Sequence, residues 1–254
     1  MLNVLSLFSG IGAFEKALSN LNIPYNLVNY CEIDKYASKA YSIIHDISED
    51  KNLHDVIKVN ASDIKDKIDL ITYGFPCQDI SSSGKQKGFV DENGERTRSG
   101  LFFEALRIIE ECKPKFAIAE NVKALTGKKF AEEFKTVLTS LEEAGYNNHW
   151  RVLNAKDFGI PQNRERVFII SIRKDIDKGF EFPSPIPLKL KLKDLLEQTV
   201  DPKYYVEIPF NQYDDETCRT IKSQYAKSSY ANFIKVGNMG ATGVQIKKNE
   251  MGSL

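Results

Sequence analysis

The chain has 254 residues and a formal net charge of zero, with 42% apolar and 28% charged residues. This composition is typical of a soluble globular domain, and no apolar run approaches the roughly 18 residues that a membrane span requires. The balanced charge does not by itself indicate a nucleic-acid-binding protein.

The N-terminus and the cysteines indicate a reducing, cytoplasmic setting. The first residues, Met1 to Val4, lack the basic flank and cleavage site of a secretory signal. The four cysteines are widely spaced and form no CxxC pair, so free thiols are expected. The three histidines are scattered, which argues against a zinc site, and we expect no bound metal.

The first expected unit is a strand, a glycine turn and a helix. Residues 2–8 form an apolar run typical of a buried strand, and Ser9-Gly10-Ile11-Gly12 follows as the turn. A helix is expected over residues 13–21, with Phe14 and Leu21 on its apolar face. The free N–H groups at such a helix start can cradle a nucleotide. The third glycine of the dinucleotide fingerprint is missing, so the pattern is not specific for a dinucleotide.

An acid follows the second expected strand, over residues 25–31. Glu32 stands about 20 residues after the glycines, where it can accept hydrogen bonds from ribose hydroxyls. A helix is expected over residues 34–45, with Tyr36 and Ile44 on its apolar side, and a short strand over residues 56–59. Asp63 is either an acceptor for an adenine amino group or a turn former.

The chain's central stretch is Gly74-Phe75-Pro76-Cys77-Gln78, which follows a buried strand over residues 69–73. Pro76 fixes its own φ and forces Phe75 to be extended. Cys77 therefore stands at the carboxyl end of a strand, where open α/β sheets bind their ligands. Residues 81–89 are rich in Ser, Gly and Lys and are expected to form a mobile lid. The alternative for Cys77 is a small buried thiol.

A second polar group follows another expected strand. A helix over residues 100–112 precedes a strand over residues 116–119, and Glu120-Asn121-Val122 comes directly after it. Glu120 is either a helix-capping acid or a functional group on the same edge as Cys77. Further on, a helix over residues 130–144 and a strand over residues 150–153 precede Gln162-Asn163-Arg164-Glu165-Arg166 and a buried strand over residues 167–172.

Strands alternate with helices over about the first 175 residues, which predicts an α/β fold: a mostly parallel sheet with helices on both faces. The alternating prolines at residues 183–187 predict a linker. We therefore expect a first domain over residues 1–182 and a second region over residues 183–254. Beyond the linker, a helical turn over residues 193–196 is the one element expected. From Thr217 onward basic residues outnumber acids, which fits either a phosphate-facing surface or a solvated tail.

Cys77, Glu120 and the two arginines Arg164 and Arg166 form a chemically coherent set. A thiolate is a strong nucleophile, and a buried carboxyl group can donate a proton or hydrogen bond. Arginines supply fixed donors for a carbonyl or phosphate. Beside an adenosine site, this set suits covalent activation of an electron-poor ring, followed by group transfer.

These motifs closely resemble those of the DNA (cytosine-5) methyltransferases, especially the small bacterial modification enzymes. Leu7-Phe8-Ser9-Gly10-Ile11-Gly12 is similar to the first S-adenosylmethionine motif of that family, Glu32-Ile33-Asp34 to the second and Asp63 to the third. Gly74 to Gln78 with Ser81 resembles the catalytic-cysteine motif, Glu120-Asn121-Val122 the catalytic-glutamate motif, and residues 162–166 the arginine motif.

The resemblance implies a Rossmann-like methyltransferase that transfers a methyl group from S-adenosylmethionine to C5 of cytosine in double-stranded DNA, in a restriction–modification or phage setting. S-adenosylhomocysteine would be the product. The implied catalytic residues are Cys77, Glu120, Arg164 and Arg166. The implied cofactor pocket contains Phe8, Ser9, Gly10, Ile11, Gly12, Glu32, Ile33, Asp63, Ile64 and Pro76. The implied DNA contacts are Gln78, Ser81, Ser83, Lys85 and Arg164.

Two departures from the family pattern affect these expectations. The family has Asp two residues before the phenylalanine of its first motif, where this chain has Ser6, so contacts around the methionine moiety are expected to be weaker. Two further family motifs are not found after residue 183, and residues 183–254 read as a partial target-recognition region. These motifs are expected either to be lost by truncation or to come from a second polypeptide.

Three alternatives remain from the sequence. The first is that the chain is a catalytically incomplete DNA- or cofactor-binding remnant, because those C-terminal motifs are missing. An RNA cytosine methyltransferase would carry a Cys-Phe-Thr signature that is absent here. An NAD-dependent oxidoreductase would explain the glycine turn and Glu32 but would leave Cys77 and Glu120 without a joint role.

Overall fold

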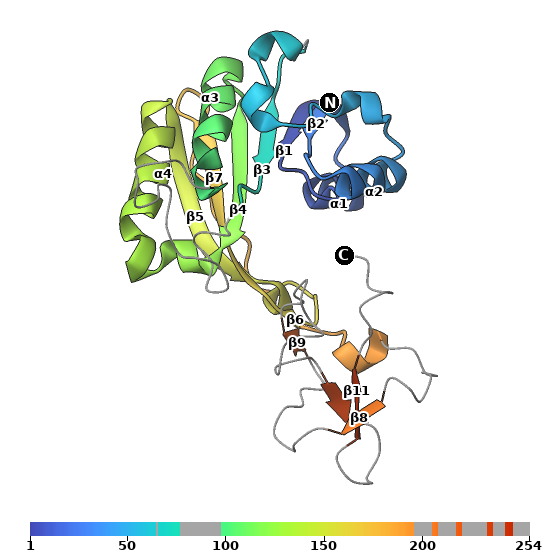
Figure 1. The fold of residues 1–254 in the computed structure, drawn as a ribbon. Coiled ribbons are helices and arrows are strands. Elements are labelled where there is room, and N and C mark those ends of the chain that lie inside the picture. Colours follow the sequence, from blue (N-terminus) through green and yellow to red (C-terminus); the bar gives the residue numbers. More distant parts are fainter. Residues whose placement is uncertain are drawn as a thin grey trace. The chain divides into compact units, whose positions relative to one another are not determined.

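The computed structural model describes residues 1–64, 66–76, 98–195, 205–207, 217–219, 233–235 and 242–245 (Figure 1). The chain divides into two compact units. One consists of Met1–Val152 and Arg166–Phe182, and the other of Leu153–Glu165 and Pro183–Leu254.

A six-stranded sheet in the order β2-β1-β3-β4-β7-β5 is the centre of the first unit (Figure 1). Its strands are β1 (Leu2–Leu7), β2 (Tyr25–Cys31), β3 (Leu70–Tyr73), β4 (Phe116–Val122), β5 (Tyr146–Asn154) and β7 (Glu165–Arg173). The pairs β1–β2, β1–β3 and β3–β4 are parallel, whereas β7 runs antiparallel to β4. The predicted mostly parallel sheet is thereby confirmed.

Alternate side chains of these strands enter two separate cores, because successive residues of a strand point to opposite faces. The larger core joins Leu5, Ile71 and Ala117 to the helices α3 (Phe102–Cys112) and α4 (Ala131–Glu143). The smaller core, on the other face, joins Val4 and Leu70 to the helices α1 (Ala13–Asn20) and α2 (Lys35–His45). Helices therefore cover both faces of the sheet.

The two N-terminal helices start in different ways. The Asp34 carboxylate caps α2 by accepting from the backbone N–H groups of Tyr36 and Ala37, at 2.8 and 2.9 Å. Gly12 precedes α1 with φ +83°, and a Cβ atom there would lie 2.1 Å from Nε2 of His45. Only glycine fits at that point, because both the conformation and the space exclude a side chain.

The predicted apolar faces of α1 and α2 are partly wrong. Leu21, Tyr36 and Ile44 are 69%, 73% and 52% exposed, whereas Glu15, which the pattern places outside the apolar face, is 1% exposed. Helical spacing alone did not reveal which flank of each short helix packs on the sheet.

The strand predicted over residues 56–59 is also wrong, because Val56–Lys58 forms a 3₁₀ helix, η2. The Asp55 carboxylate accepts from the N–H of Ile57 at 3.1 Å, and this local bond favours a turn over a strand ladder. The other described 3₁₀ helices of the first unit are η1 (Glu49–Lys51), η3 (Ala61–Asp63), η4 (Arg98–Leu101), η5 (Lys123–Thr126) and η6 (Lys128–Phe130).

The second unit consists of short elements. β6 (Gln162–Asn163) pairs in parallel with β9 (Cys218–Arg219). β11 (Thr242–Gln245) pairs antiparallel with both β8 (Tyr205–Glu207) and β10 (Phe233–Lys235). Two 3₁₀ helices, η7 (Ala155–Asp157) and η8 (Leu192–Leu195), complete its described elements, and η8 overlaps the helical turn predicted over residues 193–196. None of the helices in the described ranges has the length and apolar character of a membrane span.

Candidate active site

The glycine turn after β1 is fixed by the carboxylate of Glu32, which stands at the end of β2. Its Oε2 accepts from the N–H of Gly10 and its Oε1 from the N–H of Asp34, both at 2.8 Å. Ser9 also joins the turn to β2, because its N–H and its hydroxyl both donate to the carbonyl of Cys31 at 3.1 Å. The turn and Glu32 therefore form one rigid site.

Asn52 holds the backbone of Glu32 in place. Its Oδ1 accepts from the N–H of Glu32 at 3.0 Å, and its Nδ2 donates to the carbonyl of Glu32 at 2.9 Å. The same amide group donates to the hydroxyl of Ser38 at 2.8 Å. Asn52 is buried, so these bonds are shielded from water. The sequence offered no motif that identified this residue.

The space above the glycine turn suits a nucleoside. A Cβ atom on Gly10 would meet no atom within 4 Å, so the turn faces open space. Phe8 has φ +53°, a conformation that costs free energy in a non-glycine residue and is enriched at ligand sites. Together with the Glu32 carboxylate, these features fit an adenosine-containing cofactor such as S-adenosylmethionine.

The remaining residues implied for the cofactor pocket lie around this turn or on the next connection. Ile33 is 72% exposed, beside Glu32, and the carbonyl of Ile11 accepts from Nε2 of His45 at 3.0 Å. Asp63 is exposed at the end of η3, where its Oδ2 accepts from the N–H of Asn60 at 2.8 Å. Asp63 is therefore a turn former in this structure, and Ile64 packs against the larger core.

Glu120 and Arg166 meet on neighbouring strands. Because β7 is antiparallel to β4, Val122 pairs with Arg166, and Nε of Arg166 lies 2.9 Å from Oε1 of Glu120. The side chains are 29% exposed for Glu120 and 18% for Arg166, so the ion pair is half-buried and reachable from solvent. A carboxyl group oriented in this way can donate to or accept from a bound ring.

The turn after β3 approaches the same carboxylate. A Cβ atom on Gly74 would lie 3.9 Å from Oε2 of Glu120, and Asn121 donates from Nδ2 to the carbonyl of buried Phe75 at 3.1 Å. Pro76 is half-buried and ends the described part of this turn. The implied site residues Cys77, Gln78, Ser81, Ser83 and Lys85, and the expected lid over residues 81–89, lie outside the described residues.

Strand register places both halves of the site on one edge of the sheet. Leu7 pairs with Cys31 on one side and with Tyr73 on the other, and Tyr73 pairs with Ala119. The residues that come next on the four strands are Glu32, Phe8, Gly74 and Glu120, in the order of the sheet. Three strand spacings of about 4.8 Å separate Glu32 from Glu120, which is roughly 14 Å.

Arg164 belongs to the second unit, unlike Arg166. Its backbone N–H donates to Oδ1 of Asn154 at 3.0 Å, and its carbonyl accepts from the N–H of Ala155 at 3.0 Å. The two arginines of one motif are thus held by different parts of the fold.

The described thiols of the first unit are poor nucleophiles. Burial raises the pKa of Cys31 to about 12 and that of Cys112 to about 11, so neither is a thiolate at neutral pH. Cys31 also donates its S–H to the carbonyl of His54 at 3.0 Å. Among the described residues, no group of three or more His, Cys, Asp and Glu side chains is arranged to hold a metal ion.

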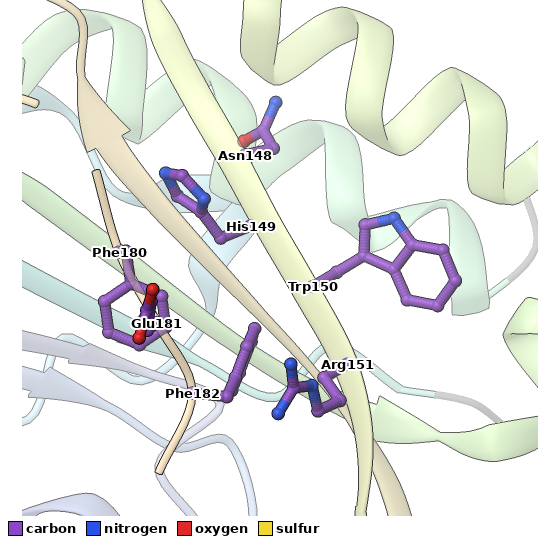
Figure 2. A pocket seen from close by; sticks show the side chains of 7 residues that line it. All are labelled: Asn148, His149, Trp150, Arg151, Phe180, Glu181 and Phe182. Carbon is purple, nitrogen blue, oxygen red and sulfur yellow. The ribbon is translucent and has the colours of Figure 1, made fainter.

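A separate hollow of about 460 Å³ lies on β5, at the opposite edge of the sheet from β2 (Figure 2). Figure 2 shows His149 and Arg151 on the side of Phe180 and Phe182, with Trp150 pointing the other way. Arg151 stacks over the Phe182 ring at 5.0 Å, and the His149 and Phe180 ring centroids are 5.7 Å apart. None of the predicted site residues lines this hollow. It lies where Phe180 and Phe182 contact the side chains of β5.

Comparisons with known proteins identify the family of this chain. Residues 2–251 match the family model described as C-5 cytosine-specific DNA methylase. The orphan methyltransferase M.SPRI of Bacillus phage SPR is 36% identical over 95% of this chain and 60% of its own length. The type II methyltransferase M2.ScrFI of Lactococcus lactis subsp. cremoris is 37% identical over 85% of this chain and 72% of its own length.

A solved structure gives the same fold. The S. pombe Dnmt2 methyltransferase superposes with a TM-score of 0.70 and 25% identity, over 94% of this chain and 78% of that one. The chain thus spans between half and four fifths of the length of the relatives that it matches.

Proposed function

Because this chain belongs to the C-5 cytosine-specific DNA methylase family, we propose that it transfers a methyl group from S-adenosylmethionine to C5 of cytosine in double-stranded DNA. The observation that carries the proposal is the row of polar positions along one sheet edge. Glu32 and the glycine turn lie at one end, and the Glu120–Arg166 pair at the other, beside the turn that leads to Cys77.

The cofactor end of the row is assigned to the adenosine moiety. Glu32 accepts from the ribose hydroxyls, Phe8 lies beside the adenine ring, and Asp63 accepts from the adenine amino group. Ser9, Gly10, Ile11 and Gly12 face the methionine moiety, with Ile33, Ile64 and Pro76 closing the pocket. S-adenosylmethionine supplies an electrophilic methyl group bonded to a positively charged sulfur.

The base end of the row is assigned to the target cytosine. Cytosine C5 and C6 are inaccessible inside a stacked duplex, so the base is flipped out before reaction. The thiolate of Cys77 adds to C6 and forms an S–C6 bond, and the ring electrons move toward C5. Glu120 donates a proton or hydrogen bond to N3, which stabilises that charge.

Arg166 keeps Glu120 in the orientation that this step requires, or contacts the base carbonyl. C5 then takes the methyl group and a base removes the C5 proton. The electron pair of the C5–H bond restores the C5–C6 double bond as the S–C6 bond breaks. Cys77 leaves as a thiolate and Glu120 recovers its proton.

DNA contacts are assigned to the segment that follows Cys77. Gln78, Ser81, Ser83 and Lys85 would close over the flipped base, and Arg164 would order this segment or contact a phosphate. Residues 1–182 would act as the catalytic domain and residues 183–254 as part of a target-recognition region. We place the protein in a restriction–modification or phage setting, in line with the printed names of its relatives.

A mechanism-based trap tests the covalent step. DNA that carries 5-fluorocytosine should form a stable adduct with the wild-type protein in the presence of S-adenosylmethionine, because fluorine at C5 cannot leave as a proton. Cys77→Ser should abolish both the adduct and methylation, since a hydroxyl is a far weaker nucleophile than a thiolate.

Cys112→Ser is the matched control. Cys112 is a half-buried thiol at the end of α3, away from the site, so this variant should form the adduct like the wild type. Trapping that persists in Cys77→Ser would refute the assignment. Cofactor binding without any adduct in the wild type would instead favour the alternative of a catalytically incomplete remnant.

A further inference from the structure

A carboxyl group is buried directly behind the glycine turn. Glu15 lies in the first turn of α1 and is 1% exposed, and within the described part of the chain no partner lies at normal hydrogen-bond distance from either carboxyl oxygen. The hydroxyls of Ser6 and of Tyr41, which faces Glu15 from α2, are nevertheless close enough to favour its ionised form weakly. A buried polar group of this kind costs free energy, so its presence calls for an explanation.

The surroundings of Glu15 contain no full counter-charge. Ser6 of β1 is close, and its hydroxyl accepts from the hydroxyl of Thr72 at 3.2 Å, so its own hydrogen can point toward Glu15. Tyr41 and His45 face Glu15 from α2, and Tyr25 and Tyr30 of β2 lie beyond Tyr41. No lysine or arginine among the described residues forms an ion pair with Glu15, so His45 is the one ionisable cation nearby.

Burial dominates the ionisation of this carboxyl group. It raises the pKa of Glu15 above its ordinary value of 4.5, while Ser6, His45 and Tyr41 oppose the shift more weakly. The N-terminal end of α1 also favours the charged form, by a smaller amount. The folded protein therefore favours the neutral acid more than the unfolded chain does.

His45 connects this carboxyl group to the turn. A carbonyl oxygen can only accept, so the 3.0 Å contact between Nε2 of His45 and the carbonyl of Ile11 means that Nε2 carries a hydrogen. The ring also lies where a side chain on Gly12 would be, 2.1 Å from that Cβ position. The position of His45 thus fixes the path of residues 10–12.

We propose that Glu15 is a positioning residue for the cofactor turn, and that it acts in its protonated form. While Glu15 is neutral, His45 remains bound to Ile11 and the turn keeps the shape that receives the cofactor. Once Glu15 ionises, its carboxylate competes with the carbonyl of Ile11 for the N–H of His45, and cofactor affinity falls. The identity of the ligand rests on the proposed function.

The test measures the affinity for S-adenosylhomocysteine by calorimetry from mildly acidic to alkaline pH. Wild-type affinity should fall as pH rises, by up to about tenfold per pH unit above the pKa of Glu15 in the folded protein. Glu15→Gln, which cannot ionise, should match the wild type at low pH and lose this decline. Lys16→Gln removes the charge of the neighbouring exposed residue, and its affinity should fall with pH as steeply as that of the wild type.

The unfolding free energy of the cofactor-free protein gives an independent readout. Because the folded protein raises the pKa of Glu15, the unfolded chain ionises first, and stability is lost as pH rises from 4.5 through the folded value. Glu15→Gln should therefore gain stability relative to the wild type as pH rises through that range. Equal pH dependence in both proteins would overturn the proposal.

A second variant covers the case in which Glu15→Gln does not fold. His45→Leu has no side-chain N–H for an ionised Glu15 to attract, so it should also flatten the decline in affinity. An unchanged decline in His45→Leu would overturn the proposal. A wild-type protein that fails to bind S-adenosylhomocysteine at any pH would instead refute the proposed function.

Discussion

Glu120 and Arg166 illustrate how a single ion pair organises the base end of the site. The pair is half-buried, so it is partly shielded from water yet accessible to a ligand. A fully exposed ion pair would contribute little to the unfolding free energy. A half-buried carboxylate that accepts a hydrogen bond from a charged group is held in one orientation more firmly than an exposed one. The value of Arg166 thus lies in orienting Glu120 rather than in stability.

Replacing Arg166 tests this role. Arg166→Ala should lower the single-turnover methylation rate roughly 10- to 100-fold, because a hydrogen bond to a charged group contributes about 1.5–3 kcal/mol. Arg166→Lys should recover part of the rate, since it restores the charge but not the planar fork. Arg173→Ala, on the same strand but paired with Asp175, should leave the rate unchanged. A normal rate in Arg166→Ala would contradict the orienting role.

Glu32 serves the other end of the row, where both of its oxygens already accept backbone hydrogen bonds. Glu32→Ala should weaken S-adenosylhomocysteine binding by about 1.5–3 kcal/mol in calorimetry, because the charge-assisted bond to ribose is lost. Glu49→Ala, an exposed acid on η1, should bind like the wild type. Unchanged affinity in Glu32→Ala would show that the cofactor lies elsewhere.

At the scale of elements, β4 and the turn after β3 are joined by one side chain. Asn121 is 3% exposed, and it connects β4 to Phe75 just before the segment that contains Cys77. The sequence marked Asn121 only as a neighbour of Glu120. Its contact explains why an amide belongs there: a buried carbonyl without a donor is costly.

Removing this contact should uncouple the turn from the strand. Asn121→Ala should cost about 1–3 kcal/mol of unfolding free energy and reduce methylation, with little change in cofactor affinity. Asn147→Ala removes an exposed amide that binds Asp177, so it should be close to neutral in both denaturation and activity measurements. If methylation by Asn121→Ala stayed at the wild-type level, the turn would not need this tie.

At the scale of the whole molecule, one part of the sheet retains half-buried apolar side chains. Phe168 and Ile170 alternate with the buried Val167 and Ile169 on β7, yet neither belongs to the described cores. The relatives M.SPRI and M2.ScrFI are longer than this chain, which spans 60% and 72% of them. The described elements thus leave this face of β7 half-buried.

The sequence by itself determined the family, the alternating α/β pattern and the positions of the glycine turn, of Glu32 and of the Gly74 turn at strand ends, because glycine turns, buried apolar runs and terminal acids are local signals. The tertiary structure decided how β7 is oriented, and hence that Arg166 meets Glu120. It also showed that Glu15 is buried and Tyr36 exposed. These outcomes depend on which strands pair and which helix flank packs inward, and long-range contacts set both.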